Sequence, residues 1–83
     1  MDKDDIEQAM QKITHEAQQF KEESTNELAL ELDKDISIIR FIIGEENFLS
    51  LHYFRRIHED AIKWLDANYW KQEKQTLAEH NNV

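Results

Sequence analysis

The chain contains no cysteine, no proline and a single glycine among its 83 residues. The lack of cysteine excludes disulfide bonds as a source of stability for a domain of this size. Proline and glycine are the residues that most often mark loops and strand turns, so their scarcity predicts helices joined by short connections. Abundant glutamate, glutamine, lysine, leucine and alanine favour the same structure.

Long apolar runs are also missing. The longest one, residues 36–43, is interrupted by Ser37 and Arg40, and it is far shorter than the roughly 20 residues that a membrane helix needs. The opening residues, Met1 to Asp5, lead into no apolar segment of the kind found in secretory signals. We therefore expect a cytoplasmic protein without membrane contact.

Positive charge is scarce in the first part of the chain, and the formal net charge is −8. Residues 1–35 carry eleven acidic and four basic side chains, whereas residues 36–83 carry seven and six. Direct binding of nucleic acid is not expected, because it depends on lysine and arginine neutralising phosphates. An acidic surface suits a partner protein with a basic surface, or imitation of a nucleic acid in a basic groove.

Apolar residues in the first segment are three or four positions apart, which is the spacing of one helix face. This face consists of Ile6, Met10, Ile13, Ala17 and Phe20. Asp4 or Asp5 suits the start of a helix, and polar Ser24 and Glu27 occupy the next positions of the series. The pattern predicts a helix over residues 4–22.

A second helix is expected over residues 25–43. Ser24 and Glu27 fit a capping box, in which Ser24 accepts a hydrogen bond from the amide of Glu27. Gly44 stands where a left-handed residue commonly follows the end of a helix. The rival interpretation of residues 28–43 is a β-hairpin, because apolar residues alternate there. The intervening turn, however, lacks the glycine or asparagine that tight hairpins favour.

The third expected helix covers residues 46–77, with a broad apolar face between Leu51 and Leu65 and a frayed tail at 78–83. Short connections make neighbouring helices antiparallel, so the predicted fold is all-α, a three-helix up-down-up bundle with a long C-terminal helix. A single domain of 83 residues has a small free energy of unfolding and usually needs additional stabilisation. With disulfide bonds excluded, self-association is the expected source of it. We therefore expect a homodimer to complete the bundle.

Residue patterns for known chemistry are missing as well. No two of the four histidines have the spacing of three or four that places two ligands on one helix face, so solvated or edge positions are expected for them. The serines lack a glycine elbow, and one glycine is too few for a phosphate-binding loop. We predict no catalytic residue, no cofactor and no metal ligand, and hence no enzyme.

An acidic row is formed by Glu27, Glu31 and Asp35, which follow each other at intervals of four. Like charges at this spacing destabilise a helix, so a positive group is expected opposite the row. Arg40, Arg55 or Arg56 of the same chain is the favoured candidate, and a basic partner or a metal ion are the others.

This row resembles the second acidic helix of the MazG-like nucleotide pyrophosphohydrolases, a family in which carboxylates from two helices hold magnesium. The chain lacks the family's Glu-x-x-Glu and later Glu-x-x-Asp pair at a matching separation. The resemblance implies the alternative function, a carboxylate-metal nucleotide hydrolase.

Aromatic residues crowd the end of the third helix, where Trp64, Leu65, Tyr69 and Trp70 precede a polar stretch. Because this helix is longer than the other two, its end projects beyond the bundle, and exposed apolar clusters usually mark interfaces. The expected function is that of a small acidic regulatory or protein–protein interaction protein. Its expected partner-binding residues are these four and the acidic row, facing a second copy or another protein with a basic or apolar surface.

Overall fold

A computed structural model describes residues 2–70, and this part of the chain is helical with no strand. The elements are α1 (Lys3–Glu22), α2 (Asn26–Ile43), α3 (Glu45–Leu49), α4 (His52–Leu65) and a closing π-helical turn, η1 (Asp66–Trp70). The prediction of an all-α protein is confirmed. The hairpin considered for residues 28–43 is wrong, because this stretch forms one continuous helix.

The first two helices begin within one residue of the expected positions. Asp4 and Asp5 lie inside the first turn of α1, where negative charge suits the helix dipole. The cap of α2 lies one residue later than the capping box predicted. Thr25 is extended and accepts a hydrogen bond from the amide of Leu28 at 3.2 Å, while Ser24 donates to the carbonyl of Phe20.

The expected long third helix is divided in two at Ser50 and Leu51. The hydroxyl of Ser50 donates to the carbonyl of Asn47, a local bond of the kind that competes with helix continuation. Phe48 is fully buried, so α3 anchors the turn that sends α4 back along the molecule. Gly44, at φ 91° and ψ 154°, precedes this turn.

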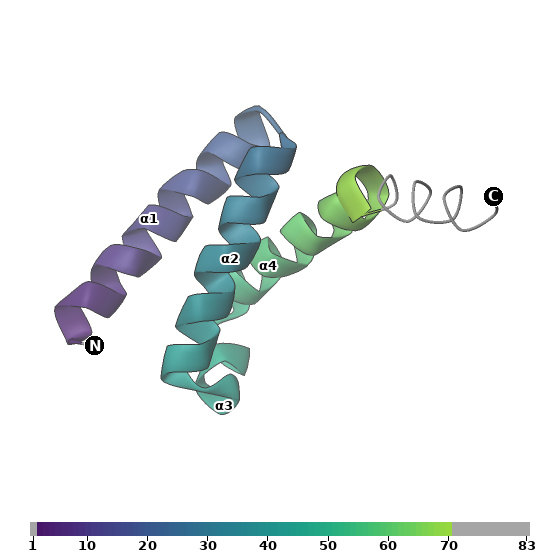
Figure 1. Ribbon diagram of the computed structural model, residues 1–83. Helices are drawn as coiled ribbons and strands as arrows, with labels where there is room; N and C mark the ends of the chain where they lie inside the picture. Colours follow the sequence, from purple (N-terminus) through teal and green to yellow (C-terminus); the bar gives the residue numbers. More distant parts are fainter. Residues whose placement is uncertain (1, 71–83) are drawn as a thin grey trace, which may run out of the picture.

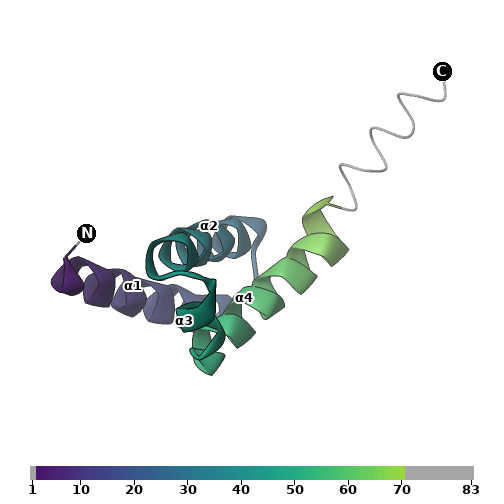
Figure 2. The same cartoon turned by 90° about the horizontal axis from the view of Figure 1, so that it is seen from below.

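Helix α2 is the central element, since it packs against both α1 and α4. In Figure 1, α1 and α2 run in opposite directions and are closest near their connection, and α4 crosses behind α2. Seen from below in Figure 2, α2 lies above α1 and α4. The core contains Ile13, Ala17, Phe20, Ala29, Leu32, Ile36, Ile39, Phe48, Ile57, Ala61 and Leu65.

These positions follow the apolar spacing of each helix, which is why the predicted core faces are largely the observed ones. Other residues of the predicted faces are half-buried. Ile6, Met10 and Ile43 lie toward the ends where α1 and α2 diverge, and Leu28 lies in the first turn of α2. No helix within residues 2–70 has both the length and the apolar character needed to cross a bilayer. The expected helix end at 77 and the tail at 78–83 lie outside the described residues.

Candidate functional site

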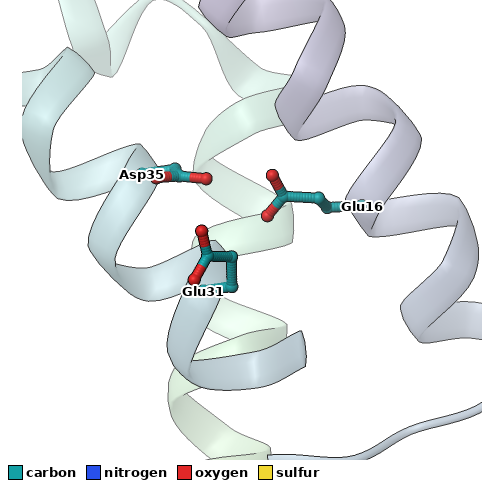
Figure 3. A group of neighbouring side chains, drawn as sticks. All are labelled: Glu16, Glu31 and Asp35. Carbon is teal, nitrogen blue, oxygen red and sulfur yellow. The ribbon is translucent and has the colours of Figure 1, made fainter. Parts of the chain in front are cut away.

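Three carboxylates from two helices converge in one acidic cluster, formed by Glu16 of α1 and Glu31 and Asp35 of α2. One oxygen of each lies within 4.8 Å of the others, and Figure 3 shows the three side chains pointing toward one another. Glu31 and Asp35 are four residues apart, so they share the face of α2 that is turned to α1. Glu16 lies beside the apolar α1 residues Ile13, Ala17 and Phe20, all of them buried.

Lys12 is the positive group opposite the acidic row. Its Nζ lies 3.4 Å from Asp35, 3.6 Å from Glu31 and 3.8 Å from Glu16. The favoured prediction of Arg40, Arg55 or Arg56 is wrong, because the row faces α1 and not α4. Arg40 binds Glu45, and Arg55 lies near Glu59.

Glu16 is the most unusual charged group of the site, with only 6% of its surface exposed. Neither of its carboxylate oxygens has a hydrogen-bond partner among the described residues. Burial, reinforced by the neighbouring carboxylate of Asp35, raises the pKa of Glu16 to about 7. Lys12 opposes this shift only in part.

The predicted acidic row is only partly brought together. Glu31 and Asp35 belong to the cluster, but Glu27 is exposed and lies outside it. Sequence reasoning missed Glu16, although its spacing of three from Ile13 and four from Phe20 places it at the edge of the apolar face of α1. That position was the available signal.

The aromatic end of the chain packs largely on its own domain. Leu65 is fully buried, and the Trp64 ring meets Phe20 of α1 edge-on with 5.9 Å between ring centroids. Tyr69 and Trp70 are half-buried and pack edge-on against each other, with 4.8 Å between ring centroids. This arrangement results from η1, in which the Asn68 side chain donates to the carbonyl of Trp64.

An exposed apolar surface lies instead on α2, and we call Ile38, Phe41 and Ile42 the α2 outer face. Phe41 is 89% exposed, Ile38 47% and Ile42 37%. Their spacing of three and four residues places them on one side of the helix. The sequence does not separate this face from the core stripe, because isoleucine and phenylalanine surround most of the helix between residues 36 and 43.

A partly buried polar pair joins α2 to α4. The Nε2 atom of His58 lies 2.7 Å from Oδ1 of Asp33, and the His58 side chain is 8% exposed. The Phe48 ring lies edge-on to the imidazole of His58, with 6.3 Å between ring centroids. The prediction that all four histidines are solvated or at an edge is therefore wrong for His58.

A shallow cleft on α4 is lined by His52, Tyr53, Arg55, Arg56 and Glu59. It shares no residue with the acidic cluster. Comparison of the chain with models of protein families, with curated proteins and with solved structures found no match.

Proposed function

We propose that this protein is a non-catalytic interaction protein that associates with a second copy of itself through the α2 outer face. The observation that carries the proposal is the exposure of Phe41 beside Ile38 and Ile42. A phenylalanine that is 89% exposed loses unfavourable contact with water when a partner covers it. Contiguous exposed apolar residues are a common feature of protein interfaces.

A second copy is the favoured partner because the face is electrostatically suited to pairing with itself. Lys34 lies one turn before Ile38 on the same side of α2, and Glu45 and Glu46 follow the other end of the helix. In an antiparallel pair centred between Ile38 and Phe41, Lys34, which lies near Glu31 of its own chain, approaches Glu45 and Glu46 of the partner subunit. Glu45 also binds Arg40 within its own chain. Twofold symmetry forms the contact between the subunits twice.

Such pairing also provides the additional stabilisation that a small domain needs, and it completes the predicted bundle with a second α2. The net charge of −8 opposes association, so salt should strengthen the dimer by screening the repulsion between copies. Tyr69 and Trp70, which are half-exposed at the other end of the molecule, remain a second predicted contact for a partner protein.

The carboxylate-metal nucleotide hydrolase is less well supported. Carboxylates from two helices do meet at the acidic cluster, but the cleft that could receive a substrate shares no residue with the cluster. That cleft lies on α4, and its lining includes arginine and histidine but neither Glu16, Glu31 nor Asp35.

The test is sedimentation equilibrium of the wild type, Phe41→Gln and Tyr53→Gln at high micromolar concentration. Tyr53 is the matched control, because it is an aromatic residue 51% exposed on α4 and lies outside the α2 outer face. We expect dimers for the wild type and Tyr53→Gln and monomers for Phe41→Gln. A monomeric wild type, or a Phe41→Gln variant that is still dimeric, contradicts the proposal.

A further inference from the structure

We propose that the acidic cluster of Glu16, Glu31 and Asp35 is a binding site for a hard divalent cation of the size of Ca²⁺. Each residue offers a carboxylate oxygen, and these oxygens lie within 4.8 Å of one another. Two ligands on one ion are separated by at most twice the metal–oxygen distance, which is about 4.6–5.2 Å for Ca²⁺. The observed spacing therefore allows one ion to touch all three groups.

Glu16 supplies the independent observation that points to a ligand. Its side chain is more than nine-tenths buried, it is directed into the cluster, and both of its oxygens lack a hydrogen-bond partner among the described residues. Asp35 Oδ2 is likewise buried without a hydrogen bond. Buried carboxylate oxygens are ordinarily hydrogen-bonded or coordinated to a metal. A cation at the centre of the cluster satisfies the two residues together.

The donor set selects the class of ion. All three ligands are carboxylates, and no imidazole of residues 2–70 joins them, so oxygen-preferring ions such as Ca²⁺ suit the site better than Zn²⁺. Three protein groups leave further coordination positions to water, which corresponds to a weak site. Lys12, whose Nζ lies 3.4–3.8 Å from the carboxylates, competes with the ion for the same charge.

The experiment is titration of metal-free protein with CaCl₂ by isothermal calorimetry at constant ionic strength and pH 8. Glu16→Gln removes the buried ligand and keeps the size of the side chain. Glu27→Gln is the matched control, since it removes one negative charge from the same acidic row outside the cluster. Lys12→Gln removes the competing ammonium group.

Changes beyond the ligand shell of a metal site already weaken binding by roughly 10–100-fold, so loss of a ligand in Glu16→Gln should weaken Ca²⁺ binding at least about tenfold. Glu27→Gln should bind like the wild type, and Lys12→Gln should bind more tightly. Lack of Ca²⁺ binding by the wild type overturns the proposal. Equal binding by the wild type and Glu16→Gln also overturns it, because the effect is then general attraction to an acidic protein. Far-ultraviolet circular dichroism of each variant establishes that it is folded.

Discussion

At the residue scale, the burial of carboxylate charge between α1 and α2 opposes folding. Glu16 lies next to Asp35 with its oxygens removed from water, and a charge in such a place is unfavourable unless it is paired. Lys12 is mostly exposed and sits at the rim of the cluster, so its pairing offsets this cost only in part. The protonation of Glu16 therefore affects the stability of the whole domain.

We predict that the free energy of unfolding falls as the pH rises from 5 to 8 in the presence of EDTA. The folded-state pKa of Glu16 is raised from 4.5 to about 7. A group whose pKa is raised on folding stabilises the protein fully below the unfolded value, and this contribution is lost as the pH rises through the folded value. The loss is on the order of 2–3 kcal/mol.

Urea denaturation at a series of pH values measures this slope, and Glu16→Gln should abolish most of it. The Arg40 side chain holds the pKa of Glu45 below its usual value through a hydrogen bond. The stabilising contribution of Glu45 is therefore lost only in acid, below the range of pH 5 to 8. An identical slope for the wild type and Glu16→Gln would show that Glu16 is not the titrating group.

Asp33 provides a second prediction at this scale. Asp33→Ala leaves the buried imidazole nitrogen of His58 without its partner, and an unsatisfied buried polar group costs about 1–3 kcal/mol. Asp33→Asn keeps an acceptor oxygen at the same place and is expected to lose less. Thermal unfolding compares the two variants, and equal losses would mean that the hydrogen bond contributes nothing beyond the negative charge.

At the scale of the elements, the apolar spacing predicted α1 and α2 closely because each buries one regular face. It did not predict the division between α3 and α4. The residues at the break, Ser50 and Leu51, are neither glycine nor proline, and the turn depends on the burial of Phe48, a tertiary effect. The proximity of Glu16 to Asp35 could not be predicted either, because the two residues belong to different helices and meet only through tertiary packing.

Gly44 tests the connection between α2 and α3. Its φ of 91° is a conformation that side chains with a Cβ rarely adopt, although nothing lies within 4 Å of the position of an added Cβ. Gly44→Ala should therefore destabilise the protein by backbone strain alone, by about 1–3 kcal/mol. Urea denaturation measures the loss. Ser37→Ala, at an exposed position in α2, should stay within about 0.5 kcal/mol of the wild type.

At the scale of the whole molecule, the helices leave an apolar surface on the outside of α2 and converging carboxylates on the side facing α1. The sequence predicted an acidic all-helical protein that works through its surfaces, and it placed the contact surface at Trp64, Leu65, Tyr69 and Trp70. The fold turns Leu65 inward. Among the described residues, α2 packs against α1, α3 and α4, and the side of the helix that carries Phe41 is left exposed.

We propose that two copies of the chain meet through the α2 outer face in an antiparallel pair. Because the chain has no cysteine, Ser37→Cys provides a single site for a spin label at the exposed edge of this face. Packed helices lie about 8–10 Å apart, so double electron–electron resonance should detect one short, narrow distance between the labels of two copies. Addition of Phe41→Gln should remove it. Absence of any dipolar coupling between copies of the labelled protein at high micromolar concentration would contradict the account.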